Sequence, residues 1–173
     1  MWYPIVLTAL TAYLLGNLNG AICMSTLLEK DDVRNHGSGN AGLTNFLRSY
    51  GGWKTLLVVL IDMGKTVLAC LVGRYMFEGL GYGLEGAMLA AVAVSLGHDF
   101  PALLGFRGGK GILCGFTVAL VLDWRVALIL LVFWFIMVAI LWRCPYCNKR
   151  LPGLPSKDVE VCKHCGRDLT EED

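Results

Sequence analysis

The sequence predicts an all-α polytopic membrane protein with about five transmembrane helices, followed by a small zinc-ribbon-like domain. Three observations lead to this prediction: long apolar blocks, a one-sided distribution of Lys and Arg, and an abrupt change to polar sequence after Trp142. Hydrophobic residues make up 55% of the 173 residues and charged residues only 17%. Such a composition lies outside the usual range of soluble proteins, so most of the chain is expected to lie in a membrane.

The first three apolar blocks are residues 4–28, 53–77 and 84–97. Each is expected to form a spanning or nearly spanning helix, because about 20 helical residues cross the hydrocarbon core. The first block has no cationic start and no small-residue cleavage site, which predicts a retained helix and not a signal peptide.

The last apolar block, residues 112–142, is interrupted by Asp123-Trp124-Arg125. Charged side chains are costly within a single span. We therefore expect a short helix, a tight turn at these three residues, and a longer helix that returns across the membrane.

Lys and Arg gather on one predicted side of the membrane. Of the fifteen, four lie in residues 29–54, two in 98–111 and six from Arg143 onward. The positive-inside rule then places both of these loops and the C-terminus in the cytoplasm, and the N-terminus outside.

The C-terminal segment contains two Cys-x-x-Cys pairs separated by fourteen residues: Cys144 and Cys147, then Cys162 and Cys165. Four thiolates complete the tetrahedron that zinc prefers, so these residues predict a structural zinc site. The predicted domains are a membrane domain over 1–143, a zinc-ribbon-like domain over 144–168 and an acidic tail over 169–173. Zinc would supply most of the folding free energy of so short a module.

The expected purpose of the zinc module is a structural cap or a docking site for a protein partner. Nucleic acid is not an expected partner, because the basic residues of the module are balanced by acidic ones and no aromatic stacking platform is apparent. The other cysteines, Cys23, Cys70 and Cys114, stand singly in apolar sequence and are expected to be small buried hydrophobic residues.

A Gly-rich polar string runs from Gly37 to Arg48 and reads Gly-Ser-Gly-Asn-Ala-Gly-Leu-Thr-Asn-Phe-Leu-Arg. Glycines let backbone N–H groups approach an anion closely, and the Arg48 guanidinium can hold a phosphate through two hydrogen bonds. The candidate site residues here are Gly37, Ser38, Gly39, Asn40, Thr44, Asn45 and Arg48. The alternative is an ordinary Gly/Asn-rich turn, and the nearby His36 is expected to be a surface residue or, less favoured, a base.

A second Gly-rich string contains Gly97-His98-Asp99-Phe100-Pro101 and ends in Gly108-Gly109-Lys110-Gly111 directly before an apolar helix. The positive end of that helix would face a bound phosphate, so Gly108, Gly109, Lys110 and Gly111 are candidate binding residues. The string is not a nucleotide-binding P-loop, which needs a glycine at Leu104 and Ser or Thr at Gly111. Nucleotide hydrolysis is therefore disfavoured.

Three further charged or titratable residues lie at or inside apolar blocks. His98 stands where a helix enters the second string and could accept or deliver a proton there, with a structural histidine as the alternative. Asp62 and Lys65 lie three positions apart on one helix face, where unpaired charges would be costly in lipid. We expect them to form an ion pair or to point into a polar cavity; the alternative places Lys65 near a substrate phosphate.

The two strings, Gly-Ser-Gly-Asn-x-Gly-x-Thr-Asn-x-x-Arg and then Gly-His-x-x-Pro with Gly-Gly-Lys-Gly, resemble those of the acyl-phosphate-dependent glycerol-3-phosphate acyltransferases, the PlsY family, over roughly residues 10–142. The resemblance implies transfer of a fatty acyl group from acyl phosphate to the 1-hydroxyl of glycerol 3-phosphate. The product would be lysophosphatidic acid, made for phospholipid biosynthesis at the cytoplasmic face of the inner membrane, with no catalytic cofactor. Ser38 and Arg48 would belong to the catalytic loop, and Gly108, Gly109, Lys110 and Gly111 to the glycerol-phosphate loop.

Our own hypothesis adds His98 as the proton acceptor. The chain departs from the family pattern at Asn17 and Asn19, where the family has Ser and Pro and where we expect helix-packing contacts. It also has the zinc-ribbon-like segment in place of the family's third motif, which carries an Arg-His and an Asn. The alternative function is therefore a catalytically inactive membrane homologue that binds a phosphorylated ligand and docks a partner through the zinc ribbon.

Overall fold

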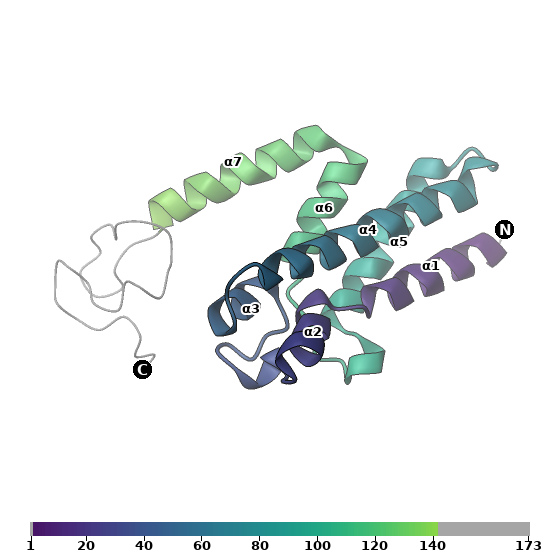
Figure 1. Cartoon of the computed structure of the whole chain (residues 1–173). Helices are drawn as coiled ribbons and strands as arrows, with labels where there is room; N and C mark the ends of the chain where they lie inside the picture. Colours follow the sequence, from purple (N-terminus) through teal and green to yellow (C-terminus); the bar gives the residue numbers. More distant parts are fainter. Residues whose placement is uncertain (1, 142–173) are drawn as a thin grey trace, which may run out of the picture. The chain divides into compact units, whose positions relative to one another are not determined.

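The computed structural model describes residues 2–141, which form helices joined by short loops (Figure 1). The chain divides into two units, with the boundary between Ala127 and Leu128. The helices are α1 (Trp2–Gly16), α2 (Gly20–Met24), α3 (Leu43–Ser49), α4 (Lys54–Glu78), α5 (Gly83–Asp99), α6 (Ile112–Leu122) and α7 (Trp124–Leu141). A π-helical turn (Ser25–Glu29) and two 3₁₀ turns (Val33–Asn35 and Ala102–Leu104) lie between them.

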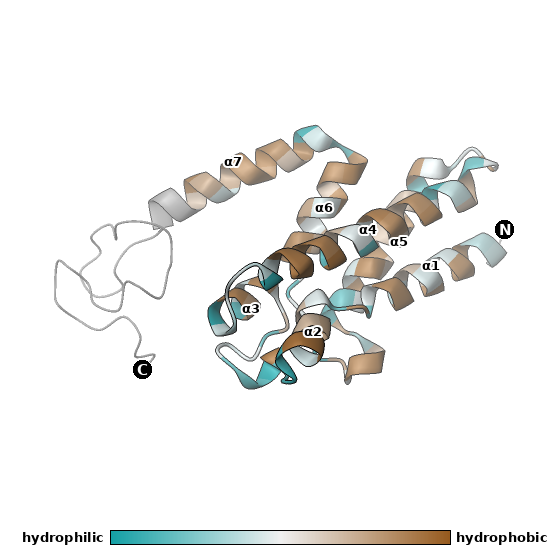
Figure 2. Cartoon of the chain, in the orientation of Figure 1, coloured by the Kyte–Doolittle hydropathy of each residue, from teal (hydrophilic) through white to brown (hydrophobic). Residues whose placement is uncertain are grey.

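Apolar residues cover most of the length of the helices, whereas polar residues gather in the loops around α2 and α3 (Figure 2). Among the described residues, the segments Lys54–Glu78 and Gly83–Leu104 are long and apolar enough to cross a membrane. The pair Trp2–Gly16 and Gly20–Glu29, bent by 40°, makes a third such segment if it is taken as one span. The predicted blocks 53–77 and 84–97 are thus confirmed as helices.

The first apolar block differs from the prediction, because it is broken at residues 17–19. Asn19 adopts an extended conformation, and its side-chain oxygen accepts a hydrogen bond from the backbone N–H of Ile22 at 3.0 Å, which caps the start of α2. Asn17 donates to the Tyr13 carbonyl at 2.8 Å at the end of α1. The expectation that both residues are helix-packing contacts is therefore wrong: they organise a helix break.

Helix α5 packs against both α1 and α4, and glycines bring these helices into close contact. A Cβ atom on Gly97 would overlap the Tyr13 carbonyl oxygen of α1, and one on Gly73 in α4 would overlap the Gly86 carbonyl oxygen of α5. The buried residues of this region are mostly alanines, such as Ala69 and Ala90. Small residues allow backbones to approach closely where lipid, and not water, surrounds the helices.

The predicted interruption at Asp123 is confirmed, and its physical cause is a helix cap. Asp123 is extended, and its side-chain oxygen accepts a hydrogen bond from the Arg125 backbone N–H at 2.9 Å. This arrangement ends α6 and begins α7, as expected of an Asp at an N-cap position. The four cysteines of the predicted zinc site lie outside the described residues.

Candidate active site

The first Gly-rich loop is wrapped around one buried amide side chain, that of Asn45 in α3. Its nitrogen donates to the carbonyl oxygens of Val33, His36 and Asn40 at 3.0, 2.9 and 3.0 Å, and its oxygen accepts from the Ser38 N–H at 3.0 Å. Gly37 has a φ of 55°, and a Cβ atom there would overlap the Asn45 oxygen. Asn45 and Gly37 therefore shape the loop: the Asn45 amide makes its hydrogen bonds within the loop, and the Asn45 oxygen fills the space beside Gly37.

The second Gly-rich loop lies directly on the end of α5. The N–H of Gly109 donates to the His98 carbonyl at 3.1 Å, and the N–H of Gly108 donates to the Asp99 carbonyl at 3.2 Å. A Cβ atom on Gly108 would overlap the His98 carbonyl oxygen, and one on Gly109 would overlap the His98 ring at Nε2. Glycine is thus required at both positions for the loop to approach the helix.

The two loops meet, although many residues separate them in the chain. The Ala41 N–H donates to the Gly108 carbonyl at 3.4 Å. Arg34, in the 3₁₀ turn just before the first loop, donates through Nη1 to the carbonyls of Leu104 and Arg107 at 2.7 and 3.3 Å. Asp32 holds the Arg34 guanidinium, with Nη2 and Oδ2 2.7 Å apart. The structure therefore brings both predicted strings into one candidate site.

The break between α1 and α2 supports the same junction. Asn19 donates to the Ala41 carbonyl at 3.0 Å, and the Asn17 side-chain oxygen accepts from the Leu103 N–H at 3.0 Å. Sequence reasoning missed these anchors and the Asp32–Arg34 clamp, because no motif marks them. The only available indication was that polar residues stand beside the Gly-rich strings.

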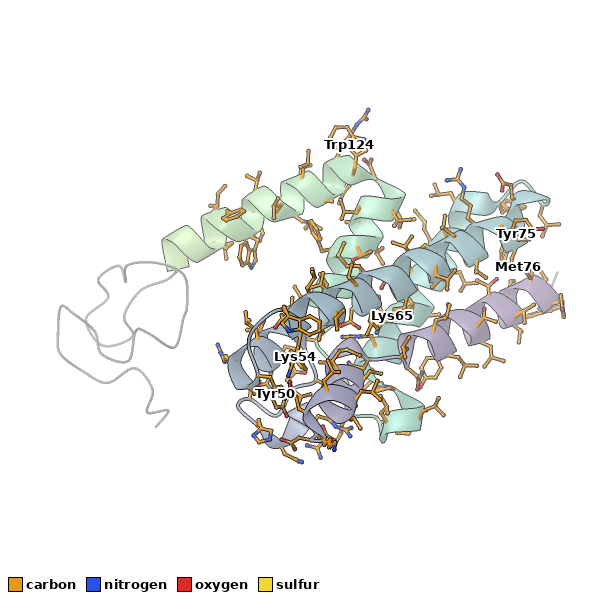
Figure 3. All side chains as sticks on the ribbon, viewed as in Figure 1. Tyr50, Lys54, Lys65, Tyr75, Met76 and Trp124 are labelled. Atoms are coloured by element: carbon orange, nitrogen blue, oxygen red, sulfur yellow. The ribbon has the colours of Figure 1, made fainter. Side chains whose placement is uncertain are left out.

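Asp62 and Lys65 of α4 and His98 at the end of α5 form a buried polar cluster next to the second loop. Lys65 Nζ lies 2.8 Å from Asp62 Oδ1 and 2.8 Å from His98 Nδ1, and it donates to the Leu18 carbonyl at 2.6 Å. The side chains of Lys65, Asp62 and His98 are 1%, 2% and 5% exposed. The expected Asp62–Lys65 ion pair is confirmed, and Figure 3 shows Lys65 part-way along α4, between Lys54 and Tyr75.

The exposed polar side chains of the junction are the ones that a charged ligand in solution would meet. Ser38, Thr44 and Arg48 are exposed on the first loop and on α3, and Arg107 and Lys110 on the second loop. The backbones of Gly39, Asn40 and Gly111 are also part of the two loops. Lys65 and Asn45, by contrast, are buried, so either would act on a ligand through the shape of the site.

The start of α6 faces a carboxyl group of the chain itself. A Cβ atom on Gly111 would lie 2.8 Å from Asp99 Oδ1, and this oxygen is buried without a hydrogen-bond partner among the described residues. The sequence predicted that this helix end faces a ligand phosphate. The Asp99 carboxyl group lies close to Gly111, directly before the start of that helix.

Ion pairs and hydrogen bonds shift the pKa values at the outer edge of the first loop. The pKa of Asp31 is lowered, first by a hydrogen bond from the Asp32 N–H and then by one from His36. Burial, followed by the hydrogen bond to Asp31, raises the pKa of Tyr50 to about 12. His36 is exposed and paired with Asp31, which fits the favoured interpretation of a surface residue.

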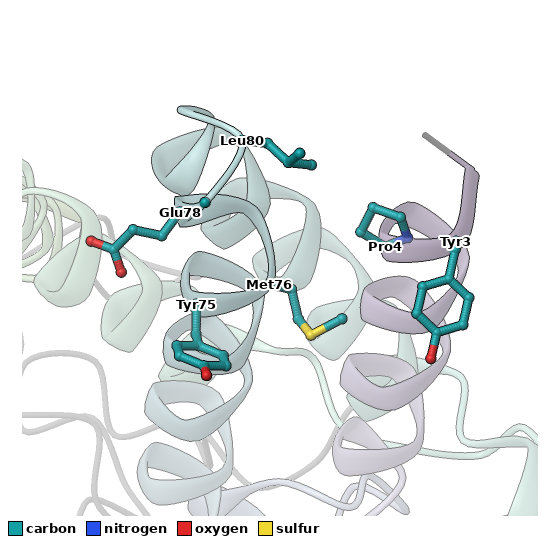
Figure 4. A pocket seen from close by; sticks show the side chains of 7 residues that line it. Tyr3, Pro4, Tyr75, Met76, Glu78 and Leu80 are labelled. Atoms are coloured by element: carbon teal, nitrogen blue, oxygen red, sulfur yellow. The ribbon is translucent and has the colours of Figure 1, made fainter.

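An open hollow of about 670 Å³ lies at the other end of the helices. It is lined by the start of α1 and the end of α4, including Tyr3, Tyr75 and Met76 (Figure 4). None of the predicted site residues lines it. Within residues 2–141, no group of His, Cys, Asp and Glu side chains could hold a metal ion.

The chain has a helical membrane domain with two adjoining Gly-rich loops, and these loops expose cations and hydroxyl groups. These features are typical of membrane proteins that bind anionic ligands. The chain belongs to the glycerol-3-phosphate acyltransferase (PlsY) family, whose model matches residues 6–145. It is 44% identical to a glycerol-3-phosphate acyltransferase of Thermoanaerobacter pseudethanolicus over 73% of this chain and 61% of the relative. A glycerol-3-phosphate acyltransferase of Jannaschia sp. is 40% identical over 78% of this chain and 64% of the relative.

Crystal structures of PlsY (YgiH), an integral membrane glycerol 3-phosphate acyltransferase, resemble this chain in fold. The glycerol 3-phosphate form has a TM-score of 0.66 at 31% identity and covers 80% of this chain and 66% of that protein. The lysophosphatidic acid form has a TM-score of 0.62 at 28% identity and covers 78% of this chain and 65% of that protein. The chain is therefore a membrane protein of this family that is helical over the described residues 2–141, and it spans about 61% of the length of its Thermoanaerobacter relative.

Proposed function

We propose that the chain transfers a fatty acyl group from acyl phosphate to the 1-hydroxyl of glycerol 3-phosphate, giving lysophosphatidic acid for phospholipid biosynthesis. The observation that carries this proposal is the contact between the two Gly-rich loops, with Ser38 and Lys110 exposed on the loops and Arg48 exposed on α3. The names of the relatives and the two ligand forms of PlsY (YgiH) support the same reaction.

The reaction needs little covalent chemistry from the protein. The hydroxyl oxygen of glycerol 3-phosphate attacks the acyl carbonyl carbon, a new ester bond forms, and the bond to the phosphate breaks. The hydroxyl proton passes to a base, for which sequence reasoning leaves His98 or a substrate phosphate. Because phosphate is a good leaving group, the protein mainly has to position the two substrates and stabilise charge.

In this proposal the cations of Arg48 and Lys110 bind phosphoryl oxygens, because a guanidinium and an ammonium are the donors best suited to them. Ser38, Thr44 and Asn40 add neutral hydrogen bonds, and Gly37, Gly108 and Gly109 act on the ligand through the shape of the two loops. Gly39 and Gly111 complete the backbone of the loops. Asn45 and Lys65 are buried and act on the ligand by holding the loops and helices of the site in place. Lysophosphatidic acid formation by the purified chain, compared with Arg48→Ala, tests the proposal.

The alternative, an inactive homologue that binds a phosphorylated ligand, predicts ligand binding without turnover. The relatives support it less well, since the Thermoanaerobacter and Jannaschia proteins carry the name of an enzyme. Glycerol 3-phosphate binding in the absence of any product would favour it.

We also propose about five spans, with the N-terminus outside and both loops and the C-terminus in the cytoplasm of a cell with an inner membrane. Trp2 and Tyr3 at the start of α1 and Tyr75 near the end of α4 are exposed aromatic residues, and they support a membrane boundary at this end of the two helices. Thiol labelling of Glu78→Cys in intact spheroplasts, with Asn35→Cys labelled only after permeabilisation, would support this orientation. The reverse pattern would contradict it.

The zinc-ribbon-like domain over residues 144–168 remains a proposal that rests on the spacing of Cys144, Cys147, Cys162 and Cys165. Metal analysis of the purified chain should give one zinc per chain, and Cys162→Ser should lose most of it. A pull-down with the unmodified chain and with Cys162→Ser would then look for a protein partner that binds only the unmodified chain. An unmodified chain without stoichiometric zinc would contradict the domain assignment.

A further inference from the structure

The geometry around His98 determines which of its ring nitrogens carries hydrogen. Lys65 Nζ lies 2.8 Å from His98 Nδ1, at hydrogen-bond distance. An ammonium has three N–H donors and no acceptor, so Nδ1 must accept this hydrogen bond. Lys65 also forms an ion pair with Asp62 Oδ1 at 2.8 Å, and a neutral His98 ring that accepts at Nδ1 carries its hydrogen on Nε2.

A protonated His98 ring does not fit this cluster. An imidazolium would place a second cation 2.8 Å from the Lys65 ammonium, in a region where both side chains are almost fully buried. The nearest carboxylate oxygen, Asp62 Oδ1, lies 3.6 Å from Nδ1 and already accepts from Lys65 and from the Gly20 N–H. Like charges at this distance in a low-dielectric interior repel strongly, so the ring is neutral.

The other ring nitrogen faces the loop junction. A Cβ atom on Gly109 would overlap His98 Nε2 and would lie 3.0 Å from the Ala41 carbonyl oxygen of the first loop. The hydrogen on Nε2 is therefore directed to the place where the two Gly-rich loops meet. Among the described residues, the side-chain hydrogen bond of His98 is made through Nδ1.

We propose that the Nε2–H of His98 donates a hydrogen bond to a phosphoryl oxygen of the ligand held at the junction, with Lys65 and Asp62 fixing the tautomer. His98 is then a ligand-contacting donor, and Lys65 and Asp62 are positioning residues. This inference rests on the proposed function for its ligand, and it replaces our sequence-based hypothesis that His98 accepts the substrate proton. A neutral ring with hydrogen on Nε2 has no free lone pair at the junction to accept one.

The tautomer can be measured without any activity. The full chain would be labelled with ¹⁵N-histidine, purified in detergent and examined by NMR, with the His98 signals assigned by their loss in His98→Gln. The chain has three histidines, which keeps the spectrum simple. An unprotonated Nδ1 and a protonated Nε2 are expected, and a protonated Nδ1 would overturn the proposal.

The ligand contact is tested by adding glycerol 3-phosphate, and separately acyl phosphate, to the same sample. A shift of the His98 Nε2 resonance with either ligand supports the proposal and identifies the phosphoryl group concerned. Absence of a shift with both ligands would overturn it. This result stands even if the chain shows no turnover, so a failure of the proposed acyltransferase function is distinguished from a failure of the donor assignment.

Two substitutions separate a donor from a base in the turnover assay. The side-chain amide of His98→Gln keeps an N–H near the position of Nε2, whereas His98→Ala removes it. We expect kcat/KM of the Gln variant within about threefold of the unmodified chain and a fall of about 10- to 100-fold for the Ala variant, the range for a hydrogen bond to a charged group. Equal losses in both variants would contradict the donor role.

Discussion

At the scale of single residues, Lys65 connects more of the molecule than any sequence motif indicates. Its ammonium, which is buried in α4, contacts Asp62 of the same helix, the Leu18 carbonyl at the α1–α2 break and the His98 ring at the end of α5. A buried charge that loses its partner is strongly destabilising, whereas a partly exposed ion pair contributes little.

Replacing Lys65 with Met should therefore destabilise the protein by about 3–5 kcal/mol, because Asp62 would be left as an unpaired buried charge. Thermal unfolding in detergent would measure the change. Lys54→Met is a matched control: its partner is Glu29, at 2.7 Å, and both side chains are partly exposed, so a change within about 1 kcal/mol is expected. Similar effects of the two substitutions would show that burial of the Lys65 pair has been overestimated.

Tyr50 gives a prediction for alkaline pH, since its pKa is raised to about 12 in the folded chain. An unperturbed tyrosine has a pKa of about 10. A raised folded-state pKa stabilises the protein below the unfolded value, and this stabilisation is lost as the pH rises from about 10 to about 12. Tyr50→Phe should remove that part of the pH dependence of unfolding. An unchanged slope in Tyr50→Phe would rule out this contribution.

At the scale of elements, the sequence predicts the helices better than the contacts between loops. The blocks 53–77 and 84–97 were predictable because apolar length alone defines a span. The break at residues 17–19 was not, because polar caps from Asn17 and Asn19 override an apolar pattern. The motif identified the loop residues, but only the structure shows that Asn45 is enclosed by its own loop.

Because the second loop lies directly on α5, adding one methyl group at Gly109 should lower the turnover rate strongly. In Gly109→Ala the new Cβ atom would overlap the His98 ring, so the loop must move. A displacement of about 1 Å at a catalytic site can lower the rate about 100-fold, and a loss of this order is expected in the turnover assay.

Gly42→Ala is the matched control within the first loop, because a Cβ atom there has no neighbour within 4 Å and the residue has a φ of −125°. It should retain most of the activity. A Gly109→Ala variant as active as Gly42→Ala would show that the loop does not need its close approach to His98.

The contact between α1 and α5 predicts a stability effect instead. Gly97→Ala would overlap the Tyr13 carbonyl oxygen, and overpacking of this kind costs about 1–3 kcal/mol. Gly64→Ala in α4 has no neighbour within 4 Å and should be neutral or slightly stabilising. Thermal unfolding of the two variants compares them directly, and equal stabilities would contradict the packing described for Gly97.

At the scale of the whole molecule, the site lies where the helical core meets the two polar loops. Three elements of the membrane domain converge there: the α1–α2 break through Asn19, α4 through Lys65, and α5 through His98. The membrane helices thus set the geometry of the loops, while the exposed cations of the loops remain accessible to a charged ligand. This arrangement is the physical basis of the proposed acyl transfer.

The most direct measurement is lysophosphatidic acid formation from acyl phosphate and glycerol 3-phosphate by the purified chain, with acyl-CoA as a second donor. Turnover is expected to depend on acyl phosphate and to fall at least about 100-fold in Arg48→Ala. Arg74→Ala, which removes an exposed cation of α4 away from the loops, should leave turnover unchanged. A folded chain that forms no product, or one whose turnover is unchanged in Arg48→Ala, would contradict the proposed acyl transfer.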